Sequence, residues 1–366
     1  MRLMIVTFDP PENVGGVEGR AVGYTSELLR LGHYVELVAL SPGYRSTRET
    51  FSGATLLKLP SSYRSLGRSI RDTWEEMSHE SIDSIFLLSG TLTIYGAVLL
   101  VLARLSGKRA AVFLYGKDIL ESRKNPLQLF LRTCGLFMAK RILTNSRFTA
   151  GLLPRPFRRQ ARVLYPSVDP KIANSNPEQS PDGERVLFVG RLVARKGLDD
   201  LLLAFKLVLQ QIPAVELDIV GDGPKQISLK EMAKRLGIDA RVRFLGELKG
   251  EPLYDCYRAA RVFVMPSRTM PEDVEGFGTV FLEAAAFGIP SVGTDSGGIP
   301  EAIRDGVTGI IVPEGDTHSL ARSLVELLTD DEKRDRLGQN ARKWASMNFT
   351  WQRSTSLLAR AFESEL

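Results

Sequence analysis

Two glutamates, Glu275 and Glu283, bracket the segment of this chain that is best suited to chemistry, E-G-F-G-T-V-F-L-E. On one unbroken helix, the two carboxylates would lie about 80° apart around the axis and about 12 Å apart along it. If Glu275 instead lies in a loop before the helix, both can line one cleft, with the free N–H groups of the helix start between them. Helix N-termini favour anions, so this arrangement suits a nucleotide sugar, which has hydroxyls at both ends and phosphates between. Taken alone, the spacing is better explained by a surface acid and a half-exposed helix acid.

Other motifs follow one another in a fixed order along the chain. They are Gly15-Gly16-Val17, Gly190-Arg191 with Lys196-Gly197, Gly221-Asp222-Gly223-Pro224, Pro266-Ser267, Glu275-Gly276-Phe277-Gly278, Glu283-Ala284 and Gly297-Gly298-Ile299-Pro300-Glu301. Together they resemble the retaining glycosyltransferases of family 4, a nucleotide-sugar group with the GT-B fold. The resemblance runs nearly end to end and is strongest in the second half of the chain.

The elements that must position these residues alternate between short apolar runs and amphipathic segments, which indicates parallel, doubly wound α/β sheets. The predicted strands are Arg2–Thr7, Tyr34–Leu40, Thr55–Lys58, Ser84–Leu88, Ala110–Leu114, Arg141–Thr144, Ala161–Leu164, Arg185–Val189, Glu216–Val220, Val242–Leu245, Arg261–Met265, Ser291–Gly293 and Gly309–Val312. A polar, proline-bearing stretch at 169–183 separates two such runs and is typical of an interdomain hinge.

We therefore predict an α/β chain of GT-B architecture, with two Rossmann-like doubly wound domains facing each other across a cleft. Residues 1–168 form the N-terminal, acceptor-binding domain, and residues 169–345 form the nucleotide-sugar-binding domain. The resemblance implies that the tail, residues 346–366, is a helix that crosses back to the first domain.

The resemblance also implies roles for individual residues. Arg191 and Lys196 bind the diphosphate, a role that suits a guanidinium fork and an ammonium charge. Glu283 accepts hydrogen bonds from the ribose hydroxyls, and Glu275 holds sugar hydroxyls and stabilises developing positive charge. The catalytic set is thus Arg191, Lys196 and Glu275.

Further donor contacts are implied around these residues. Backbone groups at Phe277, Gly278 and Thr279 meet sugar or phosphate oxygens, and Arg243 begins the segment that holds the nucleobase. A glycine turn, Gly15-Gly16, follows the first strand, where a side chain would block close approach of a phosphate.

One motif departs from the family. Many relatives carry H-G-x-D at the end of a first-domain strand, and this chain has Tyr115-Gly116-Lys117-Asp118 instead. Tyr115 keeps a hydroxyl that can bond a sugar, and Lys117 adds a cation. We expect Tyr115, Lys117 and Asp118 on the acceptor or sugar side, with the change affecting the choice of sugar more than activity.

Charge is uneven along the 366 residues. Residues 1–168 hold 23 lysines and arginines against 13 acids, a net of +10, while the remainder has a net of −5. Clusters such as Arg64, Arg68 and Arg71, or Arg155, Arg158 and Arg159, lie in the basic half. Basic residues near anionic lipid contribute about 1 kcal/mol each, so a membrane surface or a phosphorylated acceptor is a possible partner, and a solvated face without a partner is equally compatible. We do not expect nucleic acid as a partner, because no binding motif or aromatic interleaving accompanies the charges.

Targeting and redox signals are few. The chain opens on an apolar strand without a secretory signal, and its two cysteines suggest no disulfide framework. We expect a cytoplasmic protein, peripheral to the cytoplasmic membrane face if the basic half binds lipid.

The predicted function is a glycosyltransferase that moves a hexosyl group from a nucleotide-diphosphate sugar to a glycan or lipid-linked acceptor with retention of configuration. We expect no metal and no cofactor, because the chain has no D-x-D pair and no cysteine–histidine cluster, and Arg191 and Lys196 can neutralise the diphosphate. Two alternatives stay open: a nucleotide-sugar-binding scaffold without catalysis, and a GT-B relative such as a phosphorylase or an epimerase.

Overall fold

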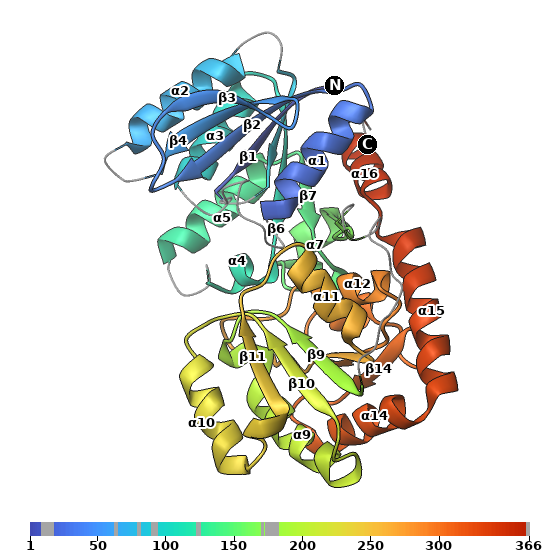
Figure 1. The fold of residues 1–366 in the computed structure, drawn as a ribbon. Helices are drawn as coiled ribbons and strands as arrows, with labels where there is room; N and C mark the ends of the chain where they lie inside the picture. The colour runs from blue at the N-terminus through green and yellow to red at the C-terminus, as the bar shows by residue number, and fades with distance from the viewer. Residues whose placement is uncertain are drawn as a thin grey trace. The chain divides into compact units, whose positions relative to one another are not determined.

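The computed structural model describes residues 1–8, 18–61, 65–78, 82–88, 94–121, 126–169, 172 and 183–363. The chain folds into two compact units (Figure 1). Unit 1 comprises Met1–Pro166 with Trp351–Leu366, and unit 2 comprises Ser167–Thr350. The sequence prediction placed the corresponding boundaries at 168/169 and 345/346.

Unit 1 is built on an eight-stranded sheet of order β3-β4-β2-β1-β5-β6-β7-β8. Its strands are β1 (Arg2–Thr7), β2 (Tyr34–Ser41), β3 (Thr47–Phe51), β4 (Ala54–Pro60), β5 (Ser84–Leu87), β6 (Arg109–Leu114), β7 (Arg141–Thr144) and β8 (Ala161–Val163). Its helices are α1 (Glu18–Arg30), α2 (Leu66–Ser78), α3 (Ile94–Leu105), α4 (Gly116–Glu121), α5 (Pro126–Met138), α6 (Arg147–Gly151), α7 (Arg155–Gln160) and α16 (Trp351–Glu363).

Two apolar cores cover the two faces of this sheet. One core contains Met77 of α2, Leu99 of α3 and Leu136 of α5, and the other contains Leu28 of α1 and Leu358 of α16. Strands buried on both faces must be apolar almost throughout, which explains why their continuous apolar runs were visible in the sequence.

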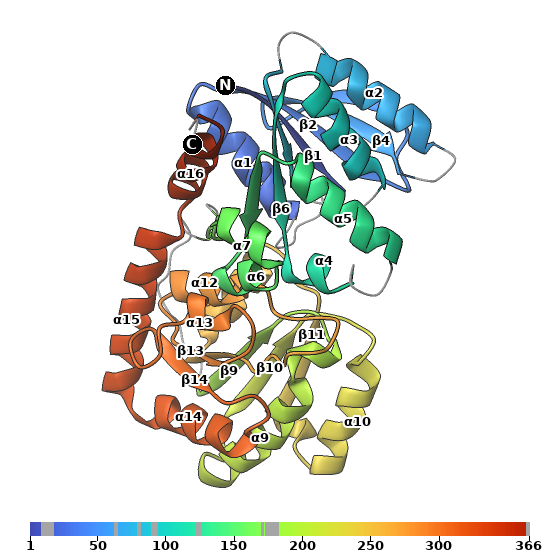
Figure 2. The ribbon, with the colours of Figure 1, turned by 180° about the vertical axis from the view of Figure 1, so that it is seen from behind.

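The last helix, α16, belongs to unit 1 because it packs on α1 (Figures 1 and 2). The Trp351 ring meets Tyr24 edge to face at 5.2 Å. A Cβ at Gly23 would lie 2.3 Å from the same indole, so glycine is what lets the two helices approach. At the far end of α16, Arg109 donates to the carbonyl of Phe362.

Unit 2 has a wholly parallel six-stranded sheet of order β11-β10-β9-β12-β13-β14. Its strands are β9 (Arg185–Val189), β10 (Glu216–Val220), β11 (Val242–Gly246), β12 (Val262–Met265), β13 (Ser291–Thr294) and β14 (Gly309–Val312). Its helices are η1 (Ala194–Lys196), α9 (Leu198–Gln211), α10 (Gln226–Leu236), η2 (Asp239–Arg241), α11 (Glu251–Ala259), α12 (Thr279–Ala286), α13 (Ile299–Ala302), α14 (Thr317–Thr329) and α15 (Asp331–Asn348).

All the strands predicted from the sequence are present, and the main addition is β3. This edge strand pairs antiparallel with β4 and is exposed at Thr47, Arg48, Glu49 and Thr50. A polar edge strand has no apolar run to reveal it, and polar residues on an edge guard against unwanted pairing. The predicted boundary at 345/346 lies inside α15, because the break that precedes α16 comes at Phe349-Thr350.

Candidate functional site

The strand order of unit 2 reverses between β9 and β12, which are neighbours in the sheet although β10 and β11 lie between them in sequence. Open α/β sheets bind ligands outside the carboxyl ends of their strands at such a reversal. Here β9 ends at Val189 and β12 at Met265. The loops that follow these two strands are therefore where a ligand site is expected, and they carry the most connected charged residues of the predicted set.

A buried ion-pair network joins these two loops. Lys196 Nζ and Arg195 Nη1 each lie 2.6 Å from Oε2 of Glu275. Arg195 Nε lies 3.0 Å from a carboxylate oxygen of Asp273, and Lys196 Nζ lies 3.0 Å from the sulfur of Met265 at the end of β12. Two sequence-predicted residues, Lys196 and Glu275, are thus direct partners.

The network holds its charges in a mostly dry environment. The side chains of Lys196, Glu275 and Arg195 are 10%, 12% and 16% exposed. Burial alone would raise the pKa of Glu275, but the charges of Lys196 and Arg195 outweigh it and lower that pKa. For Lys196 burial outweighs the attraction of Glu275, so its pKa is lowered. Removing one partner of such a buried pair costs about 3–5 kcal/mol.

Glycines let the loops around the network approach one another. Gly197 has φ +66°, and a Cβ there would lie 1.9 Å from the carbonyl oxygen of Pro266. The N–H of Gly298 donates to the carbonyl of Glu275 over 2.9 Å, and a Cβ at Gly297 would lie 2.1 Å from the same oxygen. The backbone that carries Glu275 is therefore held by the loops after β12 and β13 together.

Glu283 lies on α12 and accepts a hydrogen bond of 2.8 Å from the hydroxyl of Tyr257. Tyr257 comes from α11 and stacks on Phe287 with ring centroids 5.2 Å apart. Burial raises the pKa of Glu283; the bond from Tyr257 lowers it, the charge of Asp169 raises it, and the charge of Lys196 lowers it. Because Lys196 acts on Glu283 and pairs with Glu275, the two glutamates share one electrostatic environment.

The start of α12 lies between these glutamates in sequence. Gly278 precedes the helix with φ +87°, and Thr279 is its first residue. Glu275 lies in the preceding loop, so the loop alternative holds and the first N–H groups of α12 have no partner within the helix. Phe277 is 1% exposed, and its ring lies 5.5 Å from that of Phe349, so its side chain is part of the core.

Other predicted residues of unit 2 lie outside the network. Arg191 follows β9 with an exposed side chain, and none of the other described residues forms a hydrogen bond or ion pair with that side chain. Arg243 on β11 is paired with Asp218, through Nε and Nη2 at 2.6 Å each. Asp222 follows β10, and its side chain accepts a hydrogen bond from the N–H of Gly223.

Unit 1 carries the remaining predicted residues. Tyr115 directly follows β6, and its backbone N–H donates to Asp118 over 3.0 Å at the start of α4. Lys117 is exposed on the same turn. The predicted glycines Gly15 and Gly16 lie outside the described residues.

Three residues at the site were missed from the sequence. Arg195 is adjacent to Lys196, and Asp273 is two residues from Glu275, so both could have been found by asking which charges neighbour the expected ones. Tyr257 left no such signal, because its contact with Glu283 depends on how α11 packs beside α12.

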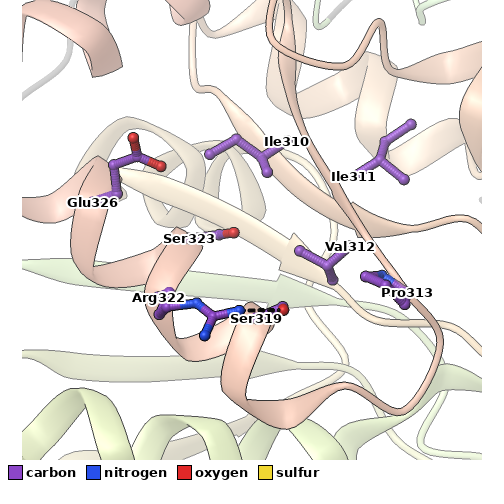
Figure 3. A pocket seen from close by; sticks show the side chains of 8 residues that line it. All are labelled: Ile310, Ile311, Val312, Pro313, Ser319, Arg322, Ser323 and Glu326. Atoms are coloured by element: carbon purple, nitrogen blue, oxygen red, sulfur yellow. Dashed lines mark hydrogen bonds between the residues drawn. The ribbon is translucent and has the colours of Figure 1, made fainter.

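A cavity lies elsewhere in unit 2. It has a volume of about 490 Å³ and is lined by Ile310, Ile311, Val312, Pro313, Ser319, Arg322, Ser323 and Glu326. Figure 3 shows these side chains coming from the β14 segment and from α14, with Arg322 bonded to Ser319. None of them belongs to the network, so this cavity is not the candidate site.

The described residues contain neither a candidate metal cluster nor a membrane-spanning helix. Within the described ranges, no three histidine, cysteine, aspartate or glutamate side chains are grouped so that they could hold a metal ion. Nor is any described helix long and apolar enough to cross a bilayer.

Comparison with known proteins identifies the family. The model of the family "Glycosyl transferases group 1" matches residues 171–344. The chain is 30% identical over 382 residues to a GDP-mannose-dependent alpha-(1-6)-phosphatidylinositol monomannoside mannosyltransferase of Mycolicibacterium smegmatis, covering 98% of this chain and 97% of that protein. It is 36% identical over 183 residues to a D-inositol 3-phosphate glycosyltransferase of Corynebacterium efficiens, covering 48% of this chain and 42% of that protein.

A solved structure supports the fold over the whole chain. The sucrose-phosphate synthase of Thermosynechococcus elongatus matches with a TM-score of 0.79 and 21% identity, covering 99% of this chain and 98% of that one. At this identity the likeness concerns the fold alone, and the predicted GT-B class of two α/β domains is confirmed. Together with the full-length relative, it follows that the chain belongs to the group 1 glycosyl transferases.

Proposed function

We propose that this glycosyltransferase moves a mannosyl group from GDP-mannose to an inositol-bearing acceptor that is phosphorylated or lipid-linked. The choice of donor and acceptor is supported by the mannosyltransferase that is similar over nearly the full length of both chains and by the inositol-phosphate glycosyltransferase that is similar over about half of this one. Both relatives are named for inositol-containing acceptors.

The observation that carries the proposal is the buried network of Lys196, Arg195 and Glu275 beside the start of α12. A nucleotide sugar presents phosphates between two sets of hydroxyls. Cations and free helix N–H groups suit the phosphates, and carboxylates suit the hydroxyls. In this reading Glu283 accepts from the ribose and Glu275 from the sugar.

The proposed reaction retains the configuration of the sugar. The bond between the anomeric carbon and the diphosphate oxygen breaks, and a bond from that carbon to the acceptor oxygen forms on the same face. The acceptor's proton passes to the leaving diphosphate, so that GDP and the glycosylated acceptor are the products. We propose that the cationic side chains stabilise the diphosphate without a metal ion.

We further propose that unit 1 meets an anionic membrane surface through α5. The side chains of Leu127, Phe130 and Phe137 on this helix are 56%, 63% and 65% exposed. The ring of Phe137 lies 4.9 Å from that of Phe157, which brings the exposed arginines of α7 close to the end of α5. An apolar helix face flanked by arginines is typical of a surface that inserts shallowly among anionic headgroups.

The first test is thermal unfolding with GDP, UDP, ADP, CDP and dTDP, each with magnesium and with a chelator. A ligand at about 100 times its dissociation constant adds about 2.7 kcal/mol of stability. We expect GDP alone to raise the unfolding midpoint, equally with and without magnesium. A rise only with magnesium would contradict metal independence, and a rise with another nucleotide would contradict the donor.

The second test is transfer of radiolabelled mannose from GDP-mannose to phosphatidylinositol in vesicles, with the anomeric configuration of the product read by NMR. We expect an α-linked product from the α-linked donor. Hydrolysis of GDP-mannose without the acceptor as fast as GDP is released with it, or a product of inverted configuration, would refute the proposed reaction.

A further inference from the structure

Unit 1 contains a buried cation that the proposed donor chemistry does not use. Arg20 lies in the first turn of α1 and is only 5% exposed. Its Nε and Nη1 are buried without a hydrogen-bond partner, and no described acid forms an ion pair with it. A guanidinium in this state is rare, because buried charges are normally paired.

Two aromatic rings make cation–π contacts with Arg20. Its guanidinium carbon lies 5.2 Å from the ring centroid of Phe113 and 5.1 Å from that of Tyr115. Cation–π contacts of this type contribute about 0.5–2 kcal/mol each. Burying an ion costs several kcal/mol in real proteins, so the rings offset only part of the cost and leave the charge in need of an anion.

The position of Arg20 in the fold also points to a ligand. The order of the strands in unit 1 reverses between β1 and β5, because β2 lies on one side of β1 and β5 on the other. Arg20 belongs to the helix that follows β1, and Tyr115 follows the carboxyl end of β6. Both therefore lie at the sheet edge where open α/β folds bind ligands.

We propose that Arg20, stacked on Phe113 and Tyr115, binds a phosphate group of the acceptor and makes the enzyme specific for phosphorylated acceptors. A guanidinium presents a planar set of donors that matches phosphate oxygens. The inference rests on the proposed function for the acceptor class. It assigns Tyr115 a second role, as the platform that orients the guanidinium.

The test compares Arg20→Met, which removes the charge but keeps an extended apolar side chain, with Arg20→Lys and with Arg104→Met. Arg104 is an exposed arginine on α3 of the same unit, so its replacement removes one positive charge without touching the site. Calorimetry measures binding of D-inositol 3-phosphate, and co-sedimentation measures binding of vesicles of phosphatidylinositol in phosphatidylcholine against pure phosphatidylcholine. The two probes separate a soluble phosphate from a lipid headgroup as the source of the anion.

We expect Arg20→Met to weaken binding of at least one probe about 30-fold or more, as for loss of a charge that pairs with a buried phosphate. Arg20→Lys should bind more weakly than wild type and more tightly than Arg20→Met, and Arg104→Met should bind like wild type. Equal binding of both probes by Arg20→Met and wild type would overturn the proposal.

The unfolding midpoint without ligand separates a ligand-binding charge from a structural one. If Arg20 serves to bind an anion, removing its unpaired charge should raise the thermal unfolding midpoint of the free enzyme, because functional sites often reduce the stability of the free protein. A lowered midpoint of Arg20→Met would mark Arg20 as a structural residue and refute the inference. The increase of the unfolding midpoint with GDP measures donor binding to unit 2. If wild type shows no increase, the donor assignment is refuted. The binding of the two phosphate probes still tests the role of Arg20 in that case.

Discussion

Replacement of Glu275 by glutamine should destabilise unit 2 far more than replacement of Lys196 by methionine. Glu275→Gln removes the negative charge that Lys196 and Arg195 share, and leaves Asp273, 3.0 Å from Nε of Arg195, as the remaining acid of the network. Lys196→Met leaves Glu275 still paired to Arg195 at 2.6 Å. The two substitutions remove the same ion pair but leave different charges buried without it, so we expect them to lower the stability by different amounts.

The magnitude follows from burial and distance. Two unit charges about 4 Å apart attract by about 4 kcal/mol at an effective dielectric constant of about 20. Removing one member of a buried pair costs about 3–5 kcal/mol, mainly because the other charge stays buried. We therefore expect Glu275→Gln to lower the free energy of unfolding of unit 2 by about 3–4 kcal/mol. The double variant should recover about 1–3 kcal/mol of this loss.

Hydrogen exchange of β9 and β12, followed by mass spectrometry, measures the opening of unit 2 separately from that of unit 1.

The charges also predict a pH dependence. Because the folded-state pKa of Glu275 is lowered, its contribution is present above the ordinary pKa of 4.5 and is lost as the pH falls through the folded-state value. The gap between wild type and Glu275→Gln should shrink accordingly in acid. A double variant no more stable than Glu275→Gln would refute the direct pairing of these charges.

Three further predictions concern other parts of the chain. Burial raises the pKa of Glu283, so GDP affinity, measured by calorimetry across a pH series, should fall as the pH drops through that raised value, and Glu283→Gln should bind weakly at every pH. Gly197→Ala should lower the unfolding free energy at least about 1 kcal/mol more than Gly237→Ala. The two glycines have φ of +66° and +69°, but only a Cβ at Gly197 would clash, so equal costs would exclude the clash with Pro266. Phe130→Asp should reduce co-sedimentation with anionic vesicles without changing the GDP-induced shift, and unchanged co-sedimentation would contradict the role of α5.

The sequence predicted the sheets of this protein well because most of their central strands are buried on both faces and read as apolar runs. It predicted less about side chains. Lys196 and Glu275 were each singled out, but as separate contacts to different parts of a ligand, and their direct pairing depends on how the loops after β9 and β12 pack. Arg243 is predicted to lie near a nucleobase. The structure shows in addition that it pairs with Asp218, and no motif in the sequence indicates this pair. The sequence does not single out Arg20, because only its burial in the folded protein distinguishes it from other arginines in the first turn of a helix.

The pairing of Lys196 with Glu275 changes how the site can meet a diphosphate. The buried network contains two cations, Arg195 and Lys196, and two anions, Asp273 and Glu275, so it has no surplus positive charge of its own. Arg191 is exposed and can approach a phosphate without breaking an existing ion pair among the described residues. Lys196 can approach one only by loosening from Glu275, which would free that carboxylate to accept from a sugar hydroxyl. If donor binding drives this exchange, the roles inferred separately for Lys196 and Glu275 are two halves of one step. Truncating either should then impair the binding of GDP-mannose more than the binding of GDP.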